Sequence, residues 1–204
     1  MTHPIDISSD PGYDNPVNHT FSGRLPMKLT PVKRAAAVAG GSLLFFLLGR
    51  FAVIPSPVPT VNLCVQYGLL GFWAVAFGPT VGGLAGLLGH IAIDLTYGEL
   101  CWSWILATAF FGTVTGILAT ITRIDLRKLE REDLIRFNLI QVAVHIVCWA
   151  GVAPVLEIVL YSESMDLIFA QGLTAAIANT ITTAIVGSAL LLVTKKFVFP
   201  ENNA

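Results

Sequence analysis

Six apolar segments fill most of the chain, and the connections between them are short and either polar or rich in proline. Several approach or exceed the roughly 20 residues that a membrane-spanning helix needs. Only 12% of the residues are charged, against a usual share of about 25%, so most of the chain cannot be solvated surface. The sequence therefore predicts an all-α polytopic membrane protein, a compact bundle of six transmembrane helices. The expected segments are residues 32–54, 61–77, 80–95, 102–121, 137–161 and 167–193.

Lysine and arginine are distributed unevenly among the connections. They lie before or at the very start of the first segment (Lys28, Lys33, Arg34), follow the fourth (Arg123–Arg136) and follow the sixth (Lys195, Lys196), whereas the other connections contain none. Six crossings put these three regions on one side, and the positive-inside rule makes that side the cytoplasm, with both termini. The polar residues 1–30 then predict a disordered cytoplasmic tail without a signal peptide. Residues 31–199 form the expected membrane domain, and residues 200–204 a short C-terminal tail.

The sequence lacks the features of several function classes. It has no basic patch of the size that nucleic acid needs and no GxxxxGK[ST] motif, so neither nucleic-acid binding nor ATP hydrolysis by that route is expected. The three cysteines stand alone in apolar surroundings and are interpreted as packing residues. No nucleophile or third metal ligand accompanies the histidines, so we expect no enzyme activity, metal or cofactor.

Polar residues inside the apolar segments gather toward the side predicted to face outward. His90 and Asp94 lie four residues apart and share a helical face. Charged groups at membrane depth are costly and are functional candidates by default. An outward-facing pocket for a small molecule explains the distribution, and mutual pairing, such as Arg50 with Asp94 or Glu157, is the alternative. The candidate substrate-binding residues are Arg50, Asn62, Gln66, His90, Asp94, Trp102, Trp104, Glu157, Gln171 and Asn179.

Small residues recur at a spacing of four near the start of the first segment. The pairs are Ala35 with Ala39, Ala36 with Gly40, and Ala37 with Gly41. Small residues at this spacing let a second helix approach closely. The stripe therefore predicts close packing, either within this chain or against a partner membrane protein.

The chain resembles the substrate-binding S components of energy-coupling factor (ECF) transporters, in the subgroup described as riboflavin-type or uncharacterised. The resemblance extends in order over about residues 33–193. The motifs that carry it are GRF (49–51), IPSPVPTVN (54–62), FGPTVG (77–82), GHIAID (89–94), WSW (102–104), APVLE (153–157) and QGLTAAIAN (171–179).

The resemblance implies a prokaryotic plasma-membrane subunit. It would capture a vitamin from outside and join a membrane T component and two ATP-binding-cassette ATPases. It also implies that Ala35, Ala36, Ala39 and Gly40 contact the T component and that residues 55–60 cap the site.

Riboflavin is the favoured substrate, since Tyr97, Trp102 and Trp104 suit stacking on its ring, and a cobalamin-type vitamin stays open. The alternative function is a stand-alone carrier or channel that uses His90, Asp94 and Glu157.

Overall fold

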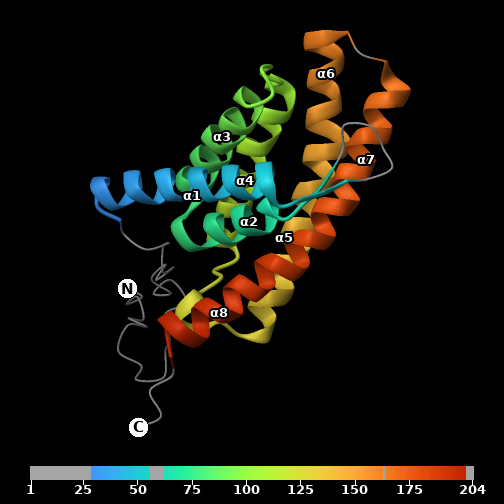
Figure 1. Cartoon of the computed structure of the whole chain (residues 1–204). Coiled ribbons are helices and arrows are strands. Elements are labelled where there is room, and N and C mark those ends of the chain that lie inside the picture. Colours follow the sequence, from blue (N-terminus) through green and yellow to red (C-terminus); the bar gives the residue numbers. More distant parts are fainter. Residues whose placement is uncertain (1–28, 56–61, 163, 201–204) are drawn as a thin grey trace, which may run out of the picture.

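The computed structural model describes residues 29–55, 62–162 and 164–200, and these residues are mostly helical (Figure 1). The all-α class predicted from the sequence is confirmed. The tail predictions fall almost wholly outside the described residues, as does the proposed cap after Pro55. The helices are α1 (Pro31–Phe51), α2 (Gln66–Phe77), α3 (Pro79–Leu95), α4 (Trp102–Ile121), α5 (Arg131–Val147), α6 (Ala153–Tyr161), α7 (Met165–Thr182) and α8 (Ser188–Val198).

Two long helices form one flank of the molecule. A π-helical turn, Cys148–Val152, joins α5 to α6, and a second, Thr183–Gly187, joins α7 to α8, giving continuous helices of 31 and 34 residues. They run side by side in Figure 1. The first π turn ends at Val152, two residues before Pro154, which has no N–H to donate to the helix.

All six predicted segments are found as helical stretches, but they differ in length. Four are long and apolar enough to cross a membrane, namely Pro31–Phe51, Trp102–Ile121, Arg131–Tyr161 and Met165–Val198. Helices α2 and α3 have only 12 and 17 residues. The segment from Trp102 to Ile121 has the predicted bounds.

A short β-hairpin replaces helix at two predicted segment ends. Strand β1 (Val53–Pro55) pairs antiparallel with β2 (Asn62–Cys64), with Ile54 opposite Leu63. The prediction of helix was therefore wrong at residues 53–54 and 62–64, whereas residue 61 lies outside the described residues. For the first strand the physical cause is local, since a residue before proline is pushed to extended conformations and Val53 and Ile54 are β-branched.

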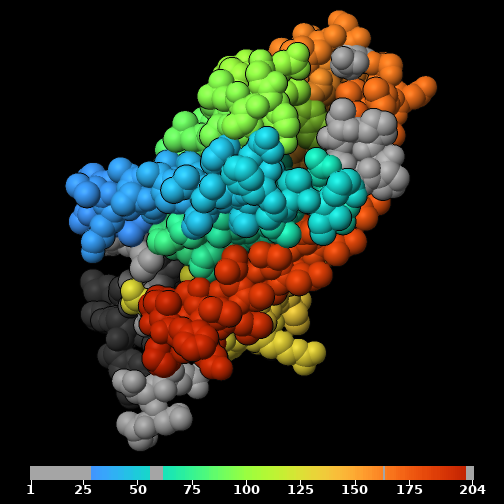
Figure 2. Space-filling model, viewed as in Figure 1, coloured from blue at the N-terminus to red at the C-terminus, as the bar shows by residue number. Residues whose placement is uncertain are grey.

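Glycines set the spacing between α3 and α4. A Cβ added to Gly82 would lie 2.8 Å from the carbonyl oxygen of Gly112, and one added to Gly86 would lie 3.0 Å from that of Thr108. Helix α1 packs on the other side of α3, where Gly89 leaves room for Phe45. Figure 2 shows α1 lying across this face, between α3 and the α7–α8 helix. The close packing of α3 against α4 and α1 thus follows from these glycines.

The charged connection and the end of α8 meet at one end of the molecule (Figure 1). After α4 a 3-10 turn, Leu126–Lys128, packs against α8, and the Arg127 guanidinium lies 5.8 Å from the ring centre of Phe199. Residues 131–136 lie before the predicted start of the fifth segment at residue 137, and they form the first turns of α5, where Glu130 and Asp133 make a capping box. The opposite end carries the α3–α4 turn, residues 96–101, and the end of α6.

Candidate functional site

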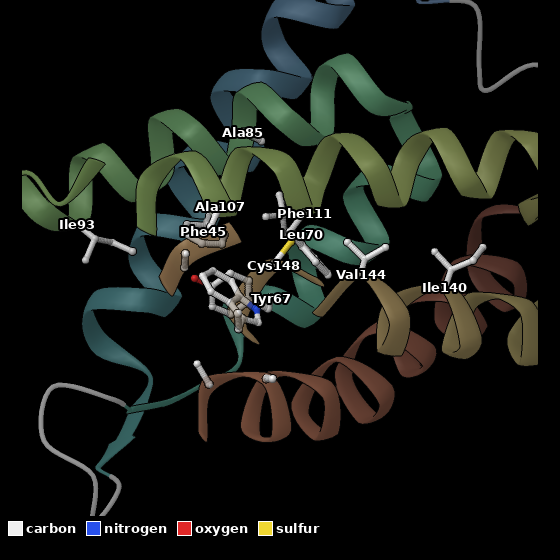
Figure 3. Close-up of a cluster of buried hydrophobic side chains, with 14 residues drawn as sticks. Phe45, Tyr67, Leu70, Ala85, Ile93, Ala107, Phe111, Ile140, Val144 and Cys148 are labelled. Atoms are coloured by element: carbon white, nitrogen blue, oxygen red, sulfur yellow. The ribbon is translucent and has the colours of Figure 1, made fainter. Parts of the chain in front are cut away.

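A hydroxyl on α4 joins the end of α3 to the start of α2. The Thr108 Oγ1 atom lies 2.6 Å from His90 Nδ1 and 3.2 Å from the Tyr67 hydroxyl. Tyr67 and Thr108 are buried, whereas His90 is partly accessible. Tyr67 and Phe45 point into the same part of the interior (Figure 3), with their rings edge to face at 5.5 Å. His90 is therefore held at the inner edge of an aromatic cluster.

The two candidate carboxylates both contact the α3–α4 turn. Asp94 Oδ2 accepts the backbone N–H of Cys101 at 2.9 Å. Glu157 Oε1, on α6, accepts from the Ser103 hydroxyl at 2.6 Å and from the Cys101 thiol at 3.1 Å. The turn is thereby fastened to both α3 and α6. His90, Asp94 and Glu157 therefore have hydrogen-bond partners within the protein, as the alternative to a ligand pocket expects.

Cys101 lies outside the membrane-spanning segments and has an altered acidity. Burial raises the pKa of Cys101 to about 11, and the hydrogen bond to Glu157 and the negative charge of that residue add to the rise. The hydrogen bond with Ser103 opposes it. This thiol is consequently protonated and weakly nucleophilic at neutral pH.

Two tryptophans form a stacked pair between α4 and the π turn of the α5–α6 helix. The rings of Trp104 and Trp149 lie 5.5 Å apart at an interplanar angle of 19°, and Tyr67 meets Trp149 edge-on at 5.1 Å. Trp149 is completely buried, whereas Trp104 is only partly buried. The partly accessible indole of Trp104 thus lies against an aromatic layer that includes Trp149 and Tyr67.

Two buried side-chain amides have carbonyl oxygens without hydrogen-bond partners among the described residues. They are Gln66 Oε1, at the start of α2, and Asn179 Oδ1, on α7. The elements lie together, because the Thr182 hydroxyl donates to the carbonyl oxygen of Cys64 at 3.0 Å. An unsatisfied buried acceptor costs about 1–3 kcal/mol, so both amides can bind a donor brought by a ligand or water. Similar unpartnered oxygens occur on Thr115 of α4 and Gln141 of α5.

The remaining predicted site residues have varied positions. Arg50, in the last turn of α1, places its guanidinium 5.0 Å from the ring centre of Tyr97, and within the described part of the chain no ion pair joins it to Asp94 or Glu157. Asn62 is exposed on β2, and Gln171 is buried on α7. The Trp102 side chain is exposed, and its backbone N–H donates to the Tyr161 hydroxyl at 3.0 Å. Their roles as ligand contacts stay predictions.

The structure adds residues that the sequence did not single out as site residues. Tyr67, Thr108 and Trp149 connect the predicted ones, and His145 accepts the indole N–H of Trp149 at 2.8 Å. A usable signal existed for one pair, since His145 and Trp149 lie four residues apart within an apolar segment and must share a helix face. Tyr67 and Thr108 carry no comparable signal.

The small-residue stripe on α1 has two sides. Ala37 faces the bundle, and its carbonyl oxygen accepts the indole N–H of Trp73 at 2.9 Å. Gly40 is partly buried, with Trp73 4.0 Å from where its Cβ would lie. Ala35, Ala36 and Ala39 are exposed. Both predicted uses of the stripe, packing within this chain and an open face, are thus compatible with the structure.

Known proteins and one family model match this chain over most of its length. The model of a family described as "ECF-type riboflavin transporter, S component" matches residues 30–196. A UPF0397 protein of Enterococcus faecalis is 38% identical over 161 residues, which cover 78% of this chain and 88% of that protein. A UPF0397 protein of Lacticaseibacillus casei is 36% identical over 166 residues, covering 81% and 89%. One from Streptococcus agalactiae is 36% identical over 167 residues, covering 81% and 92%.

Proposed function

The chain belongs to the family of ECF-type transporter S components, and we propose on this premise that it captures a vitamin with a planar ring system, riboflavin in the first place. The single observation that supports this substrate class is the partly accessible Trp104 stacked on buried Trp149. Offset stacking on an aromatic ring contributes about 0.5–1.5 kcal/mol beyond the area buried. A flat conjugated ligand is the class that gains most from such a surface.

The unpartnered amides add hydrogen-bonding groups to this surface. Gln66 and Asn179 each offer a carbonyl acceptor and an NH₂ donor, and their buried oxygens lack partners among the described residues. A ring edge that alternates N–H and C=O groups satisfies such amides. The isoalloxazine ring of riboflavin has that edge, and the peripheral amides of a cobalamin offer the same groups on a larger molecule.

The test of the substrate is to purify the whole protein in detergent and to identify what accompanies it by absorbance and mass spectrometry. Riboflavin is then titrated against the protein, with flavin fluorescence as the signal. Trp104→Ala should weaken binding at least about tenfold, because it removes the stacking surface. Phe110→Ala, at an exposed position of the same helix, is the matched control and should bind as the parent does.

Two results would change the proposal. Equal riboflavin affinity in the parent and Trp104→Ala would remove the stacking argument. A bound corrinoid without flavin would replace riboflavin by a cobalamin-type substrate while leaving the S-component function in place.

We propose further that the exposed side of the α1 stripe docks on a T component that is powered by two ATP-binding-cassette ATPases, as the family implies. Ala35, Ala36 and Ala39 are exposed and small, so a helix can approach the α1 backbone closely. Ala39→Leu should reduce co-purification with the T component while riboflavin binding persists. Ala143→Leu, at an exposed alanine of α5, is the control. Undiminished co-purification of Ala39→Leu would exclude this face.

A stand-alone carrier is the second candidate, and it would use His90, Asp94 and Glu157 for coupled proton transfer. The contacts give it little support, since Asp94 and Glu157 both accept hydrogen bonds from Cys101 of the α3–α4 turn and His90 is hydrogen-bonded to Thr108. Transport by the chain alone in liposomes, without ATP, would favour it.

A further inference from the structure

One buried histidine connects the two long helices of the bundle. His145, on α5, has no exposed surface. Its Nδ1 atom accepts the indole N–H of Trp149 at 2.8 Å, and its Nε2 atom lies 3.0 Å from the Thr183 hydroxyl. Because an indole nitrogen only donates, Nδ1 must carry a lone pair in this arrangement. The neutral ring therefore has its proton on Nε2, which donates to Thr183.

Aromatic neighbours hold the imidazole in place. The Phe111 ring stacks on it at 4.2 Å with an interplanar angle of 20°, and Tyr67 meets it edge-on at 5.9 Å. Rotation of the imidazole about its χ2 angle would break both hydrogen bonds and collide with these rings. The acceptor that fixes the Trp149 indole is thus itself fixed from several sides.

The two hydrogen-bond partners of His145 both lie in π-helical turns. Trp149 belongs to the turn Cys148–Val152, and Thr183 begins the turn Thr183–Gly187. Such turns are rare, and those that do occur are frequently found at functional sites. Asn179, with its unpartnered oxygen, precedes Thr183 by one helical turn. His145 therefore connects the layer behind Trp104 to the segment that presents the Asn179 amide.

We propose that His145 is a positioning residue of the ligand site. It fixes the orientation of Trp149, against which the ligand-facing Trp104 stacks, and it also fixes the position of Trp149 relative to α7. This inference rests on the proposed function, because it assigns His145 a part in the affinity of that same site. His145 touches no ligand in this scheme. It acts through Trp149.

The experiment follows the indole N–H signals of the whole protein in detergent, labelled with ¹⁵N-tryptophan, by NMR. The sequence has four tryptophans, and the signal that disappears in Trp149→Phe identifies Trp149. His145→Phe preserves an aromatic ring beside Phe111 but removes both hydrogen bonds. His145→Gln retains an acceptor and a donor. Riboflavin affinity is measured on the same samples, with cyanocobalamin as the second probe.

His145→Phe should move the Trp149 signal toward that of an indole without a hydrogen bond and weaken ligand binding about tenfold, the fold-change that corresponds to one lost hydrogen bond. His145→Gln should rescue both, with affinity within about threefold of the parent. Thr183→Val removes the partner of Nε2 without touching Trp149. It should shift the same signal less, and it keeps the test valid if His145→Phe fails to fold.

Three outcomes would overturn the inference. The first is a Trp149 signal that stays in place in both His145→Phe and Thr183→Val. The second is equal loss of affinity in the Phe and Gln variants with an unmoved signal, since a purely structural role predicts that result. The third is a parent protein that binds neither probe, which overturns the proposed function and the ligand role of His145 with it, whatever the indole signals show.

Discussion

The reactivity of the Cys101 thiol offers a quantitative test of how the α3–α4 turn packs. The perturbation is reaction with a small aromatic disulfide in a protein whose other cysteines are replaced (Cys64→Ser, Cys148→Ala). With the pKa raised from 9.0 to about 11, mainly by burial, the thiolate fraction at pH 8 falls about a hundredfold. The higher basicity makes the thiolate about six- to tenfold more nucleophilic, given a Brønsted coefficient of about 0.4–0.5. The reaction should be about tenfold slower than that of an ordinary exposed cysteine.

The pH dependence follows from the direction of this shift. Because the folded-state pKa is raised, the thiol stays protonated through neutral pH and ionises only as the pH approaches 11. The rate should therefore increase about tenfold per pH unit from pH 7 to pH 10 without levelling off. The assay is stopped-flow absorbance of the released thione, with a small-molecule thiol as reference.

Two matched variants should act in opposite directions. Glu157→Gln removes the negative charge that raises the pKa of Cys101, so its rate at pH 8 should increase. Ser103→Ala removes a hydrogen bond that lowers this pKa, so its rate should fall or stay unchanged. A rate that levels off below pH 10 in the parent would refute the raised pKa of Cys101, and a slower reaction in Glu157→Gln would refute the placement of Cys101 beside Glu157.

Further predictions concern packing, and each is measured as thermal unfolding of the protein in detergent. Gly112→Ala should destabilise by about 1–3 kcal/mol because its Cβ would press on the backbone of α3, whereas Gly151→Ala, whose Cβ meets no atom within 4 Å, should be neutral. A similar loss in both would contradict the close crossing. Phe137→Ala should cost about 3–5 kcal/mol, since this ring is completely buried between α2 and the second π turn. Trp73→Phe should cost about 1 kcal/mol through its lost hydrogen bond to Ala37, and an unchanged melting temperature would argue against that contact.

Hydropathy was sufficient to predict the helices. The segment from Trp102 to Ile121 is largely apolar and follows a turn, so composition alone defines its bounds. Gly82 and Gly86 lie four residues apart, a spacing that lets a second helix approach closely, and both lie against α4 in the structure. These features are local in sequence, which is why they can be read from it.

The features that depend on contacts between distant residues were missed. Trp149 is stacked on Trp104 across 45 positions of sequence, and nothing in either segment alone specifies that pairing. The β-hairpin needed two extended pieces, and only one of them, before Pro55, has a clear local cause. Among the candidate polar residues, the carboxylates contact the α3–α4 turn, while Gln66 and Asn179 have unpartnered oxygens. Which of these polar groups have partners depends on side chains from other helices.

The unequal lengths of the helices have a consequence for the surrounding bilayer. At 1.5 Å per residue, the helices of 31 and 34 residues extend about 46 and 51 Å, well beyond a hydrocarbon layer of about 30 Å. Helix α3, with 17 residues, extends only about 26 Å. The long helices must tilt or project. If α3 crosses the same bilayer, as the sequence predicts, the lipid beside it would have to thin to match it. Such a local dip would bring the aqueous boundary closer to the ends of α3, and so shorten the distance between bulk water and the side chains of His90 and Asp94.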